Sequence, residues 1–227
     1  MKYTEKELKH LSDEVGAMWL LVLSQLDKAQ QAFARSDAEL ASEVLRREHR
    51  VDLYELQVDR ASEHYIALYS PVAIDLRQIL SLMAVARTLE RIGDFAAGLA
   101  MHVLSQDCAQ LPAEILERLQ IAKMFATTQR MLTDCYTAYQ HNCTECTRQI
   151  LDDDQEVHAI YHEAPRVLAG YLQSHPEHIY CGMKLMLVIR KLERIGNHCS
   201  NIVEELVFYL DAQVLKHSRS TKRSEEN

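Results

Sequence analysis

The sequence contains little glycine and little proline. Its 227 residues include six glycines and four prolines, about a third of the roughly 12% that average usage would give. A chain this poor in turn-forming residues has few places for the tight turns that join short strands. Sandwiches, small barrels and doubly wound sheets are therefore disfavoured, and long helices with few connections are favoured.

The sequence also lacks an excess of basic residues and a long apolar run. Lys and Arg number 25 against 33 Asp and Glu, a formal net charge of −8, which disfavours non-specific binding to nucleic acid. The longest apolar-rich runs, 18–23 and 185–189, are far shorter than the roughly 20 residues that span a bilayer. No secretory signal is visible in the charged first residues. We therefore expect a soluble, cytoplasmic protein that binds no nucleic acid and does not insert into a membrane.

Six cysteines are present, and in a chain of this size without a visible signal they are expected to be reduced thiols. Cys181 and Cys199 lie among apolar neighbours and are expected in the core. One group could supply the four ligands of a zinc site around a hairpin: Cys135, His141, Cys143 and Cys146. A single Cys-x-x-Cys pair is weak evidence for zinc, so ordinary thiols remain the favoured interpretation.

Start signals divide the chain into six predicted helices. They are polar cap residues that precede a glutamate by three positions, and prolines at a first helical position: Thr4, Ser36, Asn142 and Ser174 for the caps, Pro71 and Pro112 for the prolines. The predicted helices cover about 4–34, 36–68, 71–104, 112–139, 142–172 and 174–216. No convincing alternating strand pattern is present, and short connections imply antiparallel neighbours in an all-α fold.

Apolar residues recur at helical spacing within these segments. One stripe comprises Leu40, Val44, Val51, Leu53, Leu56 and Ile66, and another comprises Leu185, Val188, Leu192 and Ile195. Isolated helices gain little stability from intrinsic propensity, so these helices must bury their stripes against one another.

A segment of 13 residues occurs twice. Residues 82–94 and 185–197 are identical at nine positions, and a weaker similarity relates 48–52 to 154–158. A match of this length at the same place in a three-helix unit indicates duplication. We therefore predict two related three-helix bundles, at 1–106 and 107–217, followed by a polar, flexible tail at 218–227.

Each copy of the repeated segment has a glycine inside a long helix, Gly93 and Gly196. Such a glycine costs on the order of 1 kcal/mol relative to alanine. Its use at the same position in both copies suggests a close approach, either by another helix or by a bound group.

Paired carboxylates accompany the repeated glycine. Glu90 and Asp94 are four residues apart and share one helix face, and Glu48 and Asp52 do the same on the preceding helix. If these faces meet, four carboxylates converge, which suits a hard or borderline ion such as iron, magnesium, manganese or zinc. The alternative is a solvated acidic face that pairs with arginines of the same motif.

The corresponding positions of the second half are Asp154, His158, Glu193 and Asn197. An amide in place of a carboxylate removes a charge, whereas a histidine adds a softer ligand. His162 follows His158 by four residues, so Asp154 and both histidines lie along one helical stripe. If either half binds a metal, the first should prefer hard oxygen-seeking ions and the second a softer ion such as zinc or iron.

Two classes of function fit long helices with acidic faces. A ferritin-like di-metal carboxylate oxidase needs Glu-x-x-His pairs on two facing helices, and only Glu7 and His10 have that spacing. No Walker-type phosphate loop and no nucleophile in a recognisable catalytic motif is present. We therefore predict no catalytic residues and favour a non-enzymatic protein that binds partners through its helix faces.

The two copies of Leu-Glu-Arg-Ile-Gly-Asp/Asn, at 89–94 and 192–197, resemble the PhoU family of phosphate-signalling regulators. So do the extension at 198–205 and the Pro-Val-x-x-Asp-Leu-Arg stretch at 71–77. The resemblance implies two three-helix bundles, a homodimer, and a cytoplasmic negative regulator of phosphate uptake and of the phosphate-starvation response. It implies as partners the phosphate-specific ABC transporter and a membrane sensor histidine kinase. It also implies iron or zinc clusters on the Glu-x-x-x-Asp faces of some members.

The sequence departs from the family pattern at several positions. Asn197 replaces the usual Asp of the second motif, and Gly98 and Met101 stand where Asn and Glu are usual in the first. Glu48 and His158 stand where Asp is commoner. These departures leave the predicted fold intact but argue against a pair of equal metal clusters.

Overall fold

Long turn-poor segments with helical apolar spacing produce an all-α structure. The computed structural model describes residues 3–105, 111–143 and 147–211, and this part contains helices but no strand. The α-helices are α1 (Tyr3–Arg35), α2 (Ala38–Tyr69), α3 (Ala73–Leu104), α4 (Ala113–Arg118), α5 (Ile121–His141), α6 (Thr147–Ser174) and α7 (Ile179–Asp211). The predicted fold class is confirmed, whereas the predicted tail at 218–227 lies outside the described residues. None of the described helices is both long and apolar enough to cross a membrane.

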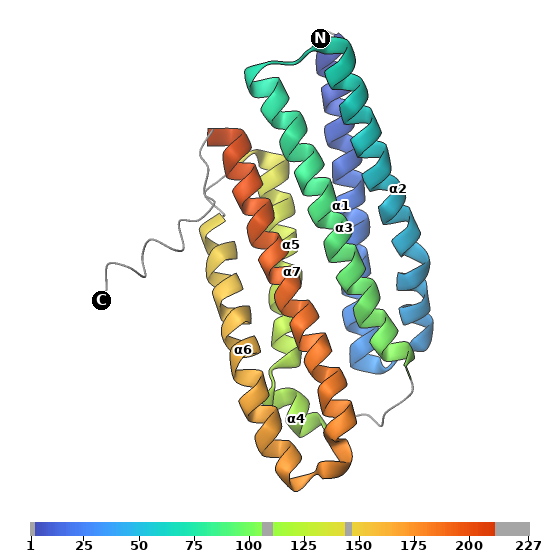
Figure 1. The fold of residues 1–227 in the computed structure, drawn as a ribbon, viewed down its shortest axis with the longest axis vertical. Helices are drawn as coiled ribbons and strands as arrows, with labels where there is room; N and C mark the ends of the chain where they lie inside the picture. Colours follow the sequence, from blue (N-terminus) through green and yellow to red (C-terminus); the bar gives the residue numbers. More distant parts are fainter. Residues whose placement is uncertain (1–2, 106–110, 144–146, 212–227) are drawn as a thin grey trace, which may run out of the picture.

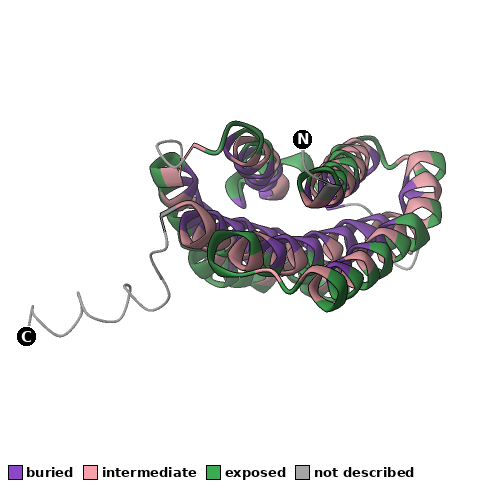
Figure 2. Cartoon of the chain, turned by 90° about the horizontal axis from the view of Figure 1, so that it is seen from above, coloured by how far each residue is buried: buried purple, intermediate pink, exposed green. Residues whose placement is uncertain are grey.

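Four long helices lie side by side in the order α2, α3, α7 and α6, with α1 and α5 behind this row (Figures 1 and 2). Helix α1 contacts α2 and α3, and α5 contacts α6 and α7. Each half of the chain therefore forms a three-helix unit, and the short α4 precedes the second unit. The units meet where α3 packs against α7 and where α1 packs against α5.

Apolar side chains from both units form one continuous core. The stripe predicted on α7 is buried throughout: Leu185, Val188, Leu192 and Ile195. On α2 the predicted stripe was too broad, because Val44 and Val51 are buried whereas Leu53 and Leu56 are 44% and 49% exposed. Helix α2 lies at the edge of the row and is covered only by α1 and α3 among the described helices, so its outer side faces solvent.

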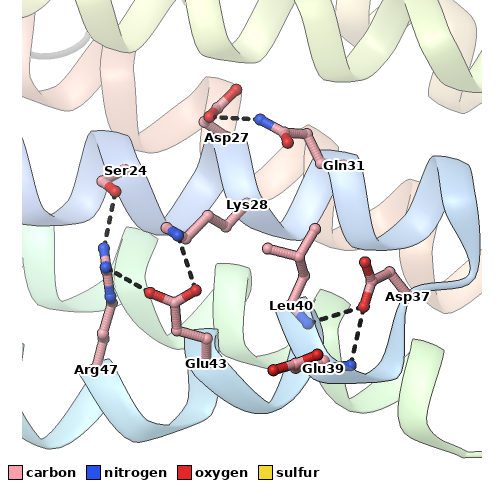
Figure 3. Close-up of polar contacts among 9 residues, drawn as sticks. All are labelled: Ser24, Asp27, Lys28, Gln31, Asp37, Glu39, Leu40, Glu43 and Arg47. Atoms are coloured by element: carbon pink, nitrogen blue, oxygen red, sulfur yellow. Dashed lines mark hydrogen bonds and ion pairs between the residues drawn. The ribbon is translucent and has the colours of Figure 1, made fainter.

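The start of α2 differs from the predicted cap at Ser36. Asp37 is the N-cap, and its carboxylate accepts hydrogen bonds from the backbone N–H groups of Glu39 and Leu40, each 3.0 Å long (Figure 3). Ser36 takes a left-handed conformation with φ 52° and belongs to the turn between α1 and α2. The predicted cap was therefore wrong by one residue.

Other predicted helix starts are shifted as well. Helix α3 begins at Ala73, two residues after Pro71. Asn142 ends α5 as a left-handed C-cap with φ 50°, so it does not begin the next helix, for which the described bounds are Thr147–Ser174. The sixth predicted helix is preceded by a separate 3-10 turn at Pro176–His178. In each case, a residue type that can begin a helix lies in the connection between two helices and not at the start of a helix.

The helix predicted at 112–139 is divided into α4 and α5. Gln120 separates them in a left-handed conformation with φ 53°. Leu119 and Ile121, on either side of it, are both buried. Residues two apart on a continuous helix point to nearly opposite sides, so the break lets both side chains enter the core.

Candidate functional site: two acidic faces

The first acidic face consists of Glu48 and Asp52 on α2 and Glu90 and Asp94 on α3, two helices that pack against each other. Burial first, and then the charges of Asp94 and Asp52, raise the pKa of Glu48. Burial first, and then mainly Asp94, raise the pKa of Glu90 to about 7. The structure therefore brings the four carboxylates together, close enough to oppose one another's ionisation.

Further charges surround this face. Glu55 adds to the rise in the pKa of Glu90, although the sequence motif did not include it. Arg91 places Nε 3.4 Å from Glu90 Oε2 and Nη1 3.5 Å from Asp94 Oδ2. Arg91 therefore compensates part of the charge, as the alternative of an arginine-paired face predicts.

The close approach predicted at Gly93 comes from neighbouring helices. A Cβ atom on Gly93 would lie 3.3 Å from Val51 Cγ1 and 3.3 Å from Gln25 Oε1. Gln25 is fully buried, and its side-chain amide donates to the carbonyl of Val44 at 3.4 Å. Plain helix packing thus accounts for the glycine, because it lets α1 and α2 approach α3 beneath the acidic side chains.

The second acidic face lies between α6 and α7 and is more fully hydrogen-bonded. Asn197 Nδ2 donates to Glu193 Oε1 at 2.6 Å. His158 Nδ1 lies 3.6 Å from the same oxygen. Glu193 is buried, so these two neighbours hold its carboxylate in place.

Aspartates at the same level of α6 are buried rather than open to solvent. A Cβ atom on Gly196 would lie 3.1 Å from Asp154 Oδ1, so this glycine makes room for the carboxylate. The adjacent Asp153 is also buried and accepts a 2.9 Å hydrogen bond from Arg130 Nε on α5. The sequence motif did not identify Asp153 or Arg130, because the repeat pointed to Asp154 among the three aspartates at 152–154.

His162 completes the predicted stripe on α6. Its Nε2 atom lies 2.9 Å from Nε2 of His158, and both side chains are exposed. Asp154 lies on the same stripe but is buried. The two imidazoles therefore lie within hydrogen-bond distance of each other, and His158 lies beside Glu193.

Within the described residues, no three His, Cys, Asp or Glu side chains are arranged so that together they could hold a metal ion. The donor chemistry of the first face fits a hard cation, because its carboxylates concentrate negative charge. The second face fits such an ion less well, since Glu193 already accepts a hydrogen bond from Asn197. Binding at either face would require side chains to turn toward the ion.

Of the cysteines near residue 140, the structure describes Cys135 and Cys143. Cys135 is fully buried, and its Sγ lies 3.5 Å from the backbone carbonyl of Cys199 on α7. Burial raises the pKa of the Cys135 thiol well above its usual range. Cys143 is half-buried beyond the end of α5, and Cys146 lies outside the described residues. Cys135 therefore serves the core, as Cys199 and Cys181 do.

A comparison with protein families matches both halves of the chain. The model described as the PhoU domain matches residues 15–103 and again residues 121–206. One match falls in each three-helix unit, which agrees with the duplication seen in the sequence.

Similar proteins cover nearly the whole chain. A protein of Aquifex aeolicus named phosphate-specific transport system accessory protein PhoU homolog is 30% identical over 97% of this chain and 98% of its own length. A protein of Caulobacter vibrioides with the same name is 32% identical over 94% of this chain and 92% of its own.

Solved structures share the fold. The phosphate transport system regulatory protein PhoU from Streptococcus pneumoniae has a TM-score of 0.83 and 27% identity, covering 94% of this chain and 99% of its own. PhoU from Pseudomonas aeruginosa has a TM-score of 0.86 and 26% identity, covering 92% of this chain and 99% of its own.

Proposed function

Since this chain belongs to the PhoU family, we propose that it is a non-enzymatic adaptor that represses phosphate uptake and phosphate-starvation signalling when phosphate is plentiful. The observation that carries the proposal is the match of both halves to the PhoU domain, together with full-length relatives named as accessory proteins of the phosphate-specific transport system. The adaptor acts in the cytoplasm on the phosphate-specific ABC transporter and on a sensor histidine kinase. It couples them by binding different states of each with different affinity.

The first acidic face is the surface that we assign to a basic partner. Burial first, and then repulsion mainly by Asp94, raise the pKa of Glu90 to about 7. A Lys or Arg side chain placed there lowers that pKa again, and the energy released favours binding. Such an association weakens with added salt, because these carboxylates are still partly exposed to solvent.

Deletion of the gene tests the adaptor role. The deletion strain is expected to show constitutive alkaline phosphatase activity or raised phosphate uptake in high phosphate. The intact gene should restore repression, and a Glu48→Gln, Glu90→Gln double variant should restore it less. Glu63→Gln, which changes an exposed carboxylate elsewhere on α2, is the matched control. A normal phosphate response in the deletion strain would contradict the proposal.

As a second candidate occupant of the first acidic face, in competition with a basic partner, we propose a hard or borderline cation, iron or magnesium, bound through Glu48, Asp52, Glu90 and Asp94. Carboxylate oxygens are the ligands that such ions prefer, and the raised pKa of Glu90 supports a local excess of negative charge. Zinc or iron at Asp154, His158, Glu193 and Asn197 is the corresponding proposal for the second face. Elemental analysis of protein purified without chelator tests both, and metal-free protein would contradict them.

The adaptor is further proposed to be a homodimer. Light scattering on the purified protein should then give twice the chain mass of 26.1 kDa. A mass equal to one chain at micromolar concentration would contradict this assignment.

A further inference from the structure

We propose that a cavity between the two units binds a small organic cation that carries an alkylammonium group. Its walls come from α1, α3, α5 and α7, and its volume is about 640 Å³, which lies within the roughly 300–1,000 Å³ of small-molecule sites. We call it the inter-unit cavity, and the lining residues that define it are Asp13, Gly16, Leu82, Tyr136, Tyr139 and Tyr209. The proposal goes beyond the adaptor function and does not rest on it, because no lining residue belongs to either acidic face.

The charge of the lining favours a cation. Asp13 supplies a carboxylate, none of the described lining residues is Lys or Arg, and His141 is the one lining side chain able to carry a positive charge. Among the described residues, Asp13 takes part in no ion pair. An anion such as phosphate would be repelled by this carboxylate, whereas an ammonium group would be attracted to it.

Three tyrosines in the same lining add to this preference. Tyr136 and Tyr139 come from α5 and Tyr209 comes from α7. Burial raises the pKa of Tyr139 to about 12 against its hydrogen bond with Ser12, and the charge of Asp13 adds to the rise. Tyr136 and Tyr209 add to it as well, so the three phenols and the carboxylate lie close together. Clustered aromatic rings are the usual surroundings of a bound alkylammonium group, because the ring faces are electron-rich.

Two of the rings are already fixed in place. The hydroxyl group of Tyr139 donates to the carbonyl of Ser12 at 2.7 Å, and its ring stacks on Trp19 with centroids 5.3 Å apart. Gln140 Nε2 donates to the hydroxyl oxygen of Tyr136 at 2.7 Å, and this ring lies 5.7 Å from Trp19. A ligand therefore has few side chains to order on binding, which favours affinity.

The inter-unit cavity is open to solvent on one side and apolar on another. A Cβ atom on Gly16 would have no neighbouring atom within 4 Å, and Asp13 is exposed, so a ligand can enter beside α1. Leu82 and Val85 of α3 are buried and belong to the lining. We therefore expect a ligand with an ammonium group at one end and a short apolar chain at the other.

Calorimetric titration of the full-length chain with choline tests the need for charge. The uncharged alcohol in which carbon replaces the choline nitrogen has the same shape, and it should bind at least about fivefold more weakly. Hexyltrimethylammonium should bind at least about tenfold more tightly than choline, since its chain reaches the apolar side chains of α3. Equal affinity for choline and the alcohol would overturn the proposal, as would no detectable binding of either cation.

Substitutions in the lining test the site itself. Asp13→Asn and Tyr209→Leu should each weaken the binding of hexyltrimethylammonium about two- to fivefold. Asp27→Asn and Tyr180→Leu are the matched controls, because they make the same changes at exposed positions of α1 and α7 outside the lining. Both controls should leave the affinity unchanged. Equal effects of the lining variants and the controls would overturn the proposal.

Gly16→Leu tests whether the ligand occupies the inter-unit cavity. The added side chain extends into the open space beside α1 and should weaken the binding of hexyltrimethylammonium at least tenfold. Leucine favours a helix more than glycine does, so the unfolding temperature should be unchanged or higher and misfolding would not explain the loss. Unchanged affinity in this variant would mean that the cation binds elsewhere.

Discussion

The carboxyl group of Glu90 is difficult to ionise in the folded protein. Burial and the nearby Asp94 raise its pKa from 4.5 to about 7. Between those pH values the unfolded chain loses this proton while the folded protein retains it. By linkage, the contribution of Glu90 to stability is largest below pH 4.5 and is lost as pH rises toward 7.

Replacement of Glu90 by glutamine should therefore stabilise the protein most at high pH. After allowance for solvent screening, we expect a rise of about 2–4 °C in the unfolding temperature at about pH 8, which corresponds to about 1 kcal/mol for a chain of this size. Near pH 4.5 the change should be close to zero. Thermal scans of Glu90→Gln and of the control Glu63→Gln at both pH values measure this. An equal shift at both values would mean that ionisation of Glu90 is not the cause.

Residue spacing was sufficient to predict which carboxylates share a helix face. An i, i+4 pair must share a helix face, so Glu90 with Asp94 and Glu48 with Asp52 followed from the sequence. Burial of Asp153 could not be predicted from the sequence, because it depends on the rotation of α6 about its axis and on the contact with Arg130 from α5. That contact joins residues 23 apart in the chain, and no local pattern records it.

At the scale of the helices, the start of α2 depends on one carboxylate. Asp37 accepts two backbone hydrogen bonds in the first turn and is favourably placed at the positive end of the helix dipole. Asp37→Ala should reduce the free energy of unfolding by about 1 kcal/mol, measured by urea denaturation. Ser36→Gly is the control for the turn, and it should not destabilise, since Ser36 already has φ 52°. If Ser36→Gly reduced the free energy of unfolding more than Asp37→Ala did, the N-cap of α2 would be Ser36 and not Asp37.

The sequence predicted where helices lie better than where they begin and end. Apolar spacing extends over many residues, so one misplaced position does not alter it. A cap is decided by one backbone conformation, and Ser36 and Asp37 are both good cap residues in isolation. The break at Gln120 could not be predicted from a glycine or a proline, because neither is present there. It follows from burying both Leu119 and Ile121, which is a property of the packed core.

At the scale of the whole molecule, the two units share a core across an approximately symmetric interface. Phe95 on α3 and His198 on α7 occupy equivalent positions of the repeat, and their ring centroids are 5.6 Å apart. Contact between equivalent positions is what a local two-fold axis between the units produces. The repeat in the sequence predicted the units. It did not predict their interface, because the similarity of one half of the sequence to the other does not indicate which surfaces of the two units pack together.

The fluorescence of Trp19 can be used to follow the contact between the two units during unfolding. Trp19 is the only tryptophan of the chain, is fully buried on α1, and donates from Nε1 to the carbonyl of Leu132 on α5 at 3.2 Å. Its ring also stacks on Tyr139, with centroids 5.3 Å apart. Tryptophan fluorescence therefore reports on the contact between units, whereas far-ultraviolet circular dichroism reports on all helices.

Because one core runs through both units, we expect the two signals to change at the same urea concentration, as in a cooperative transition. Tyr139→Phe removes the hydroxyl that donates to the carbonyl of Ser12 at 2.7 Å. It should lower both urea midpoints together, by the amount that corresponds to a loss of about 1 kcal/mol in the free energy of unfolding. If α1 and α5 instead separated while the helices persisted, fluorescence would change first. The two units would then be domains that unfold independently, each stabilised by its own three helices.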